Sequence, residues 1–312
     1  MHRLALLFLV IAAMAPASAA SEPKPIVTVL YRLDYSGWIT IPVTVNGAGP
    51  YDFIVDTGAT KTLAFQNLAD VQGFRPANTP PQFVLGLGSS GTHPTFLVGE
   101  VAVGPARLSD LTTVVLPDWQ GIAAPAGLLG LDFLSNYIVV FDAEAMQARF
   151  YPAEGETPAA IRRWSTIKLA KNDFGLGAGD LYFLKARLDD RSIPFLVDLG
   201  ASGTLINRAA YNVVTRSRFE IWLGPTLESG RITDARRTSS QADAIRIKRF
   251  RIARRAVFYD RVVLIQDAQI FADLGQTRRP FGLLGDDLLR DRSFAVDIAH
   301  SRLMIGPARK AG

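Results

Sequence analysis

The sequence contains no cysteine and only three histidines in 312 residues. Without thiols the chain cannot form disulfides, thiolate metal sites or a cysteine nucleophile, although this absence assigns no redox compartment. The two histidines beyond the N-terminal segment, His93 and His300, do not by themselves make the ligand set of a zinc site. A Gly-x-Ser-x-Gly motif is also missing, which removes a serine nucleophile on that kind of turn. We therefore expect no metal and no cofactor.

Long apolar runs are likewise absent, except at the N-terminus. Residues 1–3 include a basic side chain, residues 4–14 are apolar, and an Ala-Ser-Ala cleavage box follows at residues 17–19. This pattern predicts a secretory signal peptide over residues 1–20, because a membrane-spanning helix needs about 20 apolar residues. We expect an exported protein, periplasmic or secreted, with no stable membrane insertion after cleavage. An uncleaved N-terminal anchor is the alternative.

The chain has little excess charge of either sign. Lysine and arginine outnumber aspartate and glutamate by 34 to 29, which gives a net charge of +5. This excess is too small and too dispersed to predict nucleic-acid binding. One run, residues 246–251, alternates basic and apolar side chains, as in a strand with one charged face. Contact with an anionic surface, such as lipid or cell-wall polymer, is the other interpretation.

The most informative feature that is present is a repeated stretch. Residues 53–60 read Phe-Ile-Val-Asp-Thr-Gly-Ala-Thr, and residues 195–202 read Phe-Leu-Val-Asp-Leu-Gly-Ala-Ser. Each is an apolar run, typical of a strand buried on both faces, followed by an acid and then by a glycine that permits a sharp turn. We call residues 56–60 and 198–202 the first and second acid turns.

A second pair of motifs supports the first. Gly-Leu-Leu-Gly occurs at residues 127–130 and again at residues 282–285, each after its own acid turn. Two matched motifs in the same order indicate an internal duplication. We predict two duplicated lobes, residues 21–152 and 153–312, joined by the proline-rich and acidic residues 152–158.

The remaining pattern predicts an all-β fold with little helix. Short strand-like runs alternate with turn residues, including 26 glycines and 18 prolines. Asn46-Gly47 between two such runs is typical of a β-hairpin turn. The few helices are expected over residues 62–71, within residues 127–137 after an apolar strand, and over residues 205–214, beginning near Asn207.

Asp-Thr-Gly-Ala followed by Gly-Leu-Leu-Gly resembles the aspartic peptidases. Ala59 and Ala201 make the chain more similar to the retropepsin-type branch than to the pepsin type. The resemblance implies that each lobe is a retropepsin-like β-barrel and that the lobes form a bilobal pseudo-dimer. It also implies that Asp56 and Asp198 are the catalytic residues.

The resemblance assigns supporting roles to other residues of the acid turns. It implies that the Thr57 hydroxyl hydrogen-bonds across to the other lobe and that Gly58 and Gly200 shape the two turns. Leu199 departs from the pattern, because it stands where the family has Thr or Ser. Leu199 has no hydroxyl, so the reciprocal hydrogen bond cannot form, and the leucine is free to pack against Thr57 instead.

Two carboxyl groups in contact can perform general acid–base chemistry. They cannot both ionise cheaply, so one pKa falls, the other rises, and the pair titrates as a unit. The ionised member can take a proton from a water that attacks a peptide carbonyl, while the protonated member donates to the carbonyl oxygen. The alternative for each Asp is a structural role, in which it only binds the amides of its own turn.

The family also carries a flap over its substrate, and residues 85–91 occupy the corresponding place. We assign Gly86, Gly88 and Ser89 to this flap as candidate substrate-binding residues; a flexible surface loop is the alternative. Residues 228–231 hold the comparable place in the second half, so the sequence does not choose between one flap and two. The Gly-x-Gly-x-x-Gly pattern here lacks the following helix that a dinucleotide-binding turn requires.

Together these patterns predict an aspartic endopeptidase that acts on polypeptide as a monomer. Two alternatives stay open. The same fold can serve as a non-catalytic peptide-binding module that adds an extended chain to its sheet, which Leu199 favours. In the other, the first lobes of two chains pair in a homodimer and only Asp56 is used.

Overall fold

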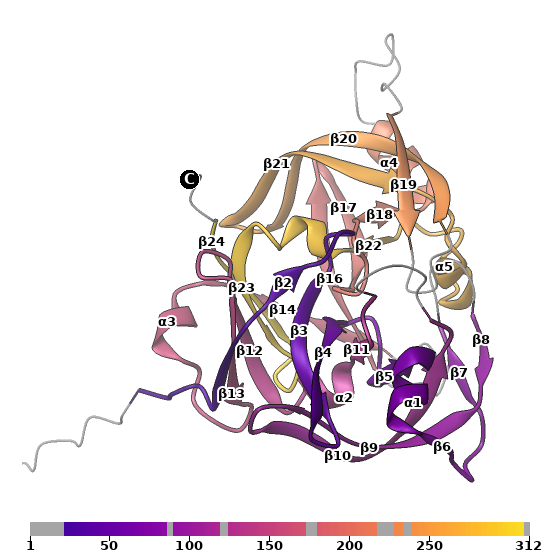
Figure 1. Cartoon of the computed structure of the whole chain (residues 1–312). Coiled ribbons are helices and arrows are strands. Elements are labelled where there is room, and N and C mark those ends of the chain that lie inside the picture. The colour runs from indigo at the N-terminus through magenta and orange to yellow at the C-terminus, as the bar shows by residue number, and fades with distance from the viewer. Residues whose placement is uncertain are drawn as a thin grey trace, which may run out of the picture.

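In the computed structural model, strands form two closed six-strand barrels and a third sheet that joins them (Figure 1). The prediction of an all-β fold with little helix is confirmed. The structure describes residues 22–85, 90–118, 124–172, 180–216, 228–233 and 239–308, with backbone only at 228–233 and 239–241. Within these ranges no helix is both long and apolar enough to cross a membrane. The predicted signal peptide lies outside them.

The first barrel starts from the predicted hairpin. Asn46 and Gly47 have φ angles of 50° and 79°, as expected for a tight hairpin turn that needs left-handed backbone. In the order of pairing, the strands are β3 (Ile39–Val45), β4 (Ala48–Val55), β11 (Gly127–Leu129), β5 (Leu63–Phe65), β10 (Ala106–Leu116) and β9 (Thr95–Val103), which returns to β3. Short strands extend the edges, β2 (Arg32–Leu33) and β6 (Arg75–Pro76), and β7 (Gln82–Val84) pairs with β8 (Gly91–His93) in a separate hairpin.

The second barrel repeats this order strand by strand. Its strands are β16 (Leu181–Leu188), β17 (Arg191–Val197), β22 (Gly282–Leu284), β18 (Leu205–Ile206), β21 (Ala256–Ile265) and β20 (Ser239–Ala253), which returns to β16. The edges are extended by β15 (Ala170–Asn172) and β19 (Glu228–Thr233). The matching order is what an internal duplication predicts.

A six-stranded sheet joins the two barrels. Its order is β1 (Val27–Leu30), β13 (Gln147–Pro152), β12 (Tyr137–Asp142), β23 (Arg292–Asp297), β24 (Arg302–Ala308) and β14 (Ser165–Lys168). The central pair, β12 and β23, is antiparallel and places Phe141 opposite Phe294, whose rings stack with centroids 4.6 Å apart. One hydrophobic cluster contains core residues of both barrels and of this sheet, so the two halves are packed as a single unit.

The helices correct one of the expected boundaries. The helices are α1 (Gln66–Gln72), α2 (Leu131–Leu134), α3 (Ala159–Arg162), α4 (Arg208–Thr215), α5 (Gln269–Asp273) and the 3₁₀ turn η1 (Asp286–Leu288). The helix predicted over 62–71 was wrong at its beginning, where β5 forms instead. The helix predicted to begin near Asn207 is confirmed, because α4 begins at Arg208 with Asn207 as its N-cap, and β18 forms just before it. Both short strands pair with the Gly-Leu-Leu strands, β11 and β22, whose positions more than 60 residues away no local pattern reveals.

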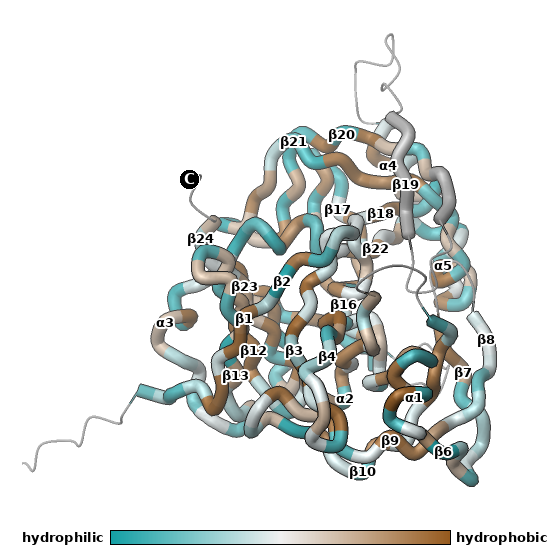
Figure 2. The backbone as a smooth tube through the Cα atoms, in the orientation of Figure 1, coloured by the Kyte–Doolittle hydropathy of each residue, from teal (hydrophilic) through white to brown (hydrophobic). Residues whose placement is uncertain are grey.

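Hydropathy follows the strands as the sequence predicts. Figure 2 shows hydrophobic and hydrophilic residues alternating along β20 and β21. On β20, Ile245 and Ile247 are buried, whereas Arg246 and Lys248 are exposed. The run of residues 246–251 is therefore a strand with one charged face, and its apolar face completes the barrel core.

Phe294→Ala is expected to lower the free energy of unfolding by about 3–5 kcal/mol, because it removes a fully buried ring and the stacking contact of that ring with Phe141. Chemical denaturation followed by fluorescence measures the difference. Val71→Ala is the matched control, since Val71 is 72% exposed. A loss no larger than that of the control would show that the joining sheet contributes little to stability.

Candidate active site

The two acids of the repeated motif occupy equivalent places. Asp56 directly follows β4, and Asp198 directly follows β17. The backbone N–H of Asp56 donates to Leu129 O at 3.0 Å, and that of Asp198 donates to Leu284 O at 3.0 Å. The parallel Gly-Leu-Leu strand beside each acid strand thus holds the start of each acid turn in the same way.

The fold brings the two acid turns into contact. The exposed fractions of Asp56 and Asp198 are only 8% and 7%, and their carboxyl groups are within hydrogen-bonding reach of each other. A Cβ atom on Gly58 would lie 2.5 Å from Asp198 Cγ, and one on Gly200 would lie 2.3 Å from Asp56 Cγ. Each carboxyl group therefore lies against the glycine of the opposite turn, a position that no larger residue can occupy.

Backbone amides hold the Asp56 carboxylate in place. The N–H groups of Gly58 and Ala59 donate to Asp56 Oδ1 at 2.8 and 3.1 Å. This is the structural role that an Asp in a tight turn commonly has. It uses one oxygen of Asp56, and it does not explain why a second buried carboxyl group lies against the first.

Burial raises the pKa of both carboxyl groups. For Asp56, burial acts against the amide hydrogen bond from Gly58, which lowers the pKa, and the net shift is upward. For Asp198, burial and then the charge of Asp56 raise the pKa well above its usual range. The pair thus retains a proton at pH values where an isolated Asp is ionised.

Thr57 connects the two acid turns. Its hydroxyl donates to Val197 O at 2.9 Å and accepts from the Leu199 N–H at 3.0 Å, so both bonds cross from the first barrel to the second. Thr57 is fully buried. Because both partners are backbone groups of the second acid strand and turn, Thr57 fixes the distance between the turns.

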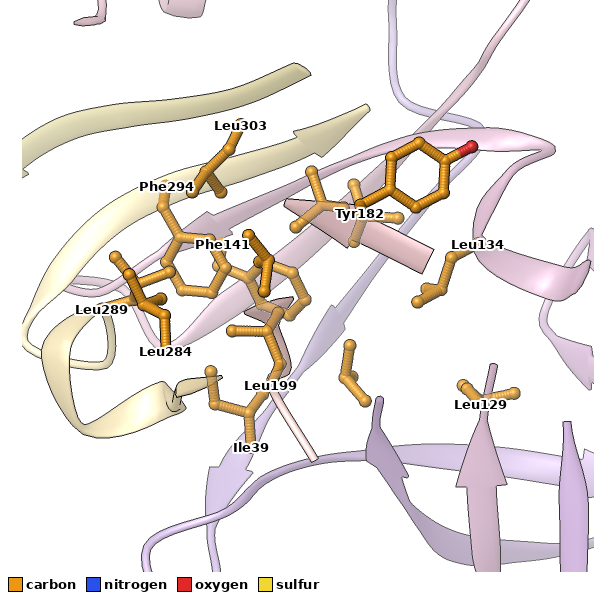
Figure 3. Close-up of a cluster of buried hydrophobic side chains, with 14 of the residues drawn as sticks. Ile39, Leu129, Leu134, Phe141, Tyr182, Leu199, Leu284, Leu289, Phe294 and Leu303 are labelled. Carbon is orange, nitrogen blue, oxygen red and sulfur yellow. The ribbon is translucent and has the colours of Figure 1, made fainter. Parts of the chain in front are cut away.

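The Leu199 side chain makes no such bond, although the backbone N–H of Leu199 donates to Thr57. Its side chain is fully buried in the hydrophobic cluster that also contains Ile39 of the first barrel and Leu284 of the second (Figure 3). A side-chain hydroxyl, that of Thr57, therefore makes crossing hydrogen bonds from the first acid turn. At the same position of the second acid turn, Leu199 contributes apolar packing instead. The two turns are alike in backbone and different in what anchors them.

Sequence reasoning missed Trp38, which also crosses between the barrels. Its indole Nε1–H donates to Gly200 O at 2.8 Å, and the side chain is fully buried. By strand register the equivalent residue of the second half is Leu181, because Thr40 pairs with Ile54 as Phe183 pairs with Leu196, and a leucine side chain has no donor for such a bond. No sequence signal could have found it, because its partner lies 162 residues away.

Sequence reasoning also missed a hydrogen-bond network of one threonine and one aspartate that occurs in each barrel, although both residues recur at matching places in the two halves of the sequence. In the first barrel, Thr62 Oγ1 donates to Asp132 Oδ1 at 2.7 Å and accepts from the Gly130 N–H at 3.1 Å. In the second barrel, Thr204 Oγ1 makes the equivalent bonds with Asp287 at 2.6 Å and Gly285 at 3.1 Å. Each network ties the Gly-Leu-Leu-Gly motif to the residues that follow its acid turn.

The predicted flap residues Gly86, Gly88 and Ser89 lie outside the described residues. Beside them, Leu85 packs on a hydrophobic cluster of the second barrel, and Ser90 Oγ donates to Asp273 Oδ2 at 2.5 Å. The described ends of this segment thus reach from the first barrel to α5 of the second. In the part of the chain that the structure describes, no three His, Cys, Asp or Glu side chains gather as metal ligands.

Thr57→Val is expected to lower the free energy of unfolding by about 1–3 kcal/mol for each of the two buried backbone groups left without a partner. Thr57→Ser keeps the hydroxyl and is the matched control. Denaturant unfolding of both variants measures the loss. If both lose the same stability, the crossing hydrogen bonds are not what joins the turns.

Asp198→Asn is expected to gain stability over the wild type as the pH rises. Burial keeps Asp198 protonated in the folded chain where the unfolded chain ionises, so the wild type loses unfolding free energy above about pH 4. Asparagine has no such proton. Denaturant unfolding near pH 4 and near pH 7 measures the gain, and an equal difference at both pH values would contradict this assignment.

Residues 41–133 match the family model described as Aspartyl protease. The matched part runs from β3 into α2 and includes Asp56, Thr57 and the first Gly-Leu-Leu-Gly motif. No curated protein matches the chain.

Proposed function

We propose that this chain, whose residues 41–133 match the family model described as Aspartyl protease, is an aspartic endopeptidase that cleaves extended polypeptides with Asp56 and Asp198. The observation that carries the proposal is the contact of two buried carboxyl groups, each against the glycine of the opposite acid turn. The family match concerns only the first barrel, and the pseudo-symmetric second barrel supplies the second carboxyl group.

The chemistry follows from the shared proton. With one proton on the pair, the ionised carboxylate takes a proton from a water molecule as that water attacks the carbonyl carbon of a peptide bond. The protonated partner donates its proton to the carbonyl oxygen, so a neutral tetrahedral intermediate forms. The protonated carboxyl group then donates its proton to the nitrogen while the other takes a proton from a hydroxyl of the intermediate, and the C–N bond breaks. A carboxylic acid and an amine are released, and the pair again holds one proton.

Both carboxyl groups come from one chain. This arrangement supports a monomeric enzyme, since the first barrel meets its partner within the same chain through Thr57 and the joining sheet. The homodimer in which two copies of Asp56 meet would require the first acid turn to leave the second. We extend the proposal to an exported enzyme, periplasmic or secreted, on the basis of the signal-like residues 1–20.

Leu199 favours a second candidate function, a non-catalytic peptide-binding module on the same fold. Its leucine side chain removes one of the two hydroxyl groups that would stiffen the acid turns. Binding of an unfolded polypeptide without cleavage at any pH would support this candidate over the enzyme.

Asp56→Asn and Asp198→Asn are each expected to lower the rate of cleavage by about 10²–10⁴-fold or more, because each variant removes one partner of the proton transfer. The assay is cleavage of an unfolded protein by the mature chain from acid to neutral pH. Asp52 lies on β4, the strand that Asp56 follows, and its side chain is 44% exposed, so Asp52→Asn is the control and should keep full activity.

The two variants also separate the alternatives. Loss in both, with the fold retained, supports one acid pair within one chain. Full activity of Asp56→Asn would rule out the pair. Loss in Asp56→Asn alone, together with a dimer in light scattering, would point to pairing between first barrels of two chains.

A further inference from the structure

A tryptophan of the first barrel binds the backbone of the second acid turn. Trp38 directly precedes β3, and its side chain is fully buried. Its indole Nε1–H donates to Gly200 O at 2.8 Å. Gly200 is also the residue that lies against the Asp56 carboxyl group, so closely that it has no room for a Cβ atom. The indole therefore holds the part of the second turn that touches the acid of the first.

A tight turn fixes the place from which the indole extends. Over residues 34–38, Asp34 Oδ1 accepts the backbone N–H groups of Ser36 and Trp38 at 2.8 and 2.9 Å. The backbone N–H of Asp34 donates to Trp38 O at 3.0 Å, and that of Gly37 donates to Asp34 O at 3.0 Å. An Asp side chain that closes its own turn in this way leaves the backbone little freedom. We call residues 34–38 the Trp38 turn.

The Trp38 turn meets the second barrel at another place as well. Gly37 has a φ angle of 93°, and the Arg290 guanidinium occupies the space that a Cβ atom on this glycine would need. The Arg290 backbone N–H donates to Asp286 O at 2.8 Å, and the Asp286 N–H donates to Ala201 O at 2.9 Å. The Trp38 turn thus contacts both the second acid turn and the segment of the second barrel that is bonded to it.

Trp38 and Thr57 hold successive residues of the second acid turn. Thr57 binds the backbone groups on either side of Asp198, and Trp38 binds Gly200 O. The Leu199 side chain has no polar atom with which to return a bond to the first barrel. The position of the second turn therefore depends on two side chains of the first barrel.

We propose that Trp38 is a positioning residue that acts through Gly200: its indole N–H holds the second acid turn against the Asp56 carboxyl group and so sets the separation of the two acids. The effect on catalysis rests on the proposed peptidase function. The hold on the second turn does not, and it can be measured in a chain that cleaves nothing.

The expected effect follows from the geometry of proton transfer. Each acid must lie within hydrogen-bonding reach of the water or the peptide carbonyl with which it exchanges a proton. A displacement of about 1 Å in a catalytic group can cost about 10²-fold in rate. Without the indole N–H, Gly200 O loses this partner, and a less constrained turn shifts Gly200 relative to Asp56. Contacts with the rest of the substrate are unchanged, so kcat rather than KM should respond.

The test removes the indole N–H and keeps the shape of the ring. Replacement of Trp38 by β-(3-benzothienyl)alanine, through stop-codon suppression, puts sulfur in place of the N–H; Trp38→Phe is the simpler second variant. Trp164→Phe is the matched control, because Trp164 is a half-buried tryptophan that packs on a cluster of the joining sheet. On a peptide substrate, kcat of both Trp38 variants should fall by about 10–100-fold while KM changes by less than about threefold. The control should keep both constants.

Amide hydrogen exchange at the two acid turns gives a readout that needs no catalysis. Glycine labelled with ¹³C at the carbonyl and alanine labelled with ¹⁵N select the Gly–Ala peptide groups, which include Gly58–Ala59 and Gly200–Ala201. The Ala201 N–H donates to Asp198 O at 3.2 Å and closes the second turn, and the Ala59 N–H donates to Asp56 Oδ1 at 3.1 Å in the first. Loss of the indole N–H should speed exchange at Ala201 by about 10-fold or more and leave Ala59 as in the wild type.

An unchanged kcat in the benzothienyl variant, or an equal fall of kcat in Trp164→Phe, would overturn the proposal. So would exchange at Ala201 that keeps the wild-type rate or that rises equally at Ala59, because the indole would then not hold the second turn in particular. Faster exchange at Ala201 alone, in a chain that cleaves no substrate, would instead support the hold on the second turn and count against the peptidase function.

Discussion

The centre of this molecule depends on the close approach of the two acid turns. Gly58 and Gly200 allow it, because each lies where any side chain would collide with the carboxyl group of the opposite turn. Two buried carboxyl groups repel each other once both ionise, so the contact persists only if other interactions hold it. The Thr57 hydroxyl, with two bonds to the second barrel, supplies the most direct of these.

The rest of the fold holds the turns from a distance. The Gly-Leu-Leu strands fix the start of each turn, the threonine–aspartate networks fix the segment after it, and the joining sheet packs Phe141 on Phe294. The hydrophobic cluster that runs through both barrels adds burial on a scale that exceeds the desolvation of a few polar groups. The acid pair can therefore be unfavourable by itself within a stable chain.

The symmetry of the duplication is broken mainly around the second turn. Leu199 replaces a hydroxyl with apolar packing, Trp38 donates to Gly200 O from the first barrel, and Asp286 places a carboxyl group where the first half has Leu131. All three differences lie at or beside the second acid turn, whose Gly200 also lies against the Asp56 carboxyl group. Burial is the leading cause of the upward pKa shift of both carboxyl groups.

The sequence alone determined the duplication, the two acid strands and turns, and the all-β class, because buried strands, turn glycines and repeated motifs are written in contiguous residues. It did not reveal the short strands β5 and β18, because these residues form strands only where distant segments pair with them. It predicted that the Thr57 hydroxyl bonds across to the other lobe, but it did not reveal the two backbone groups that Thr57 binds, the Trp38 bond, or the burial of Asp286 against the second turn. Only the tertiary structure decided these features, since each depends on residues that lie far apart in the chain and meet where the two barrels pack.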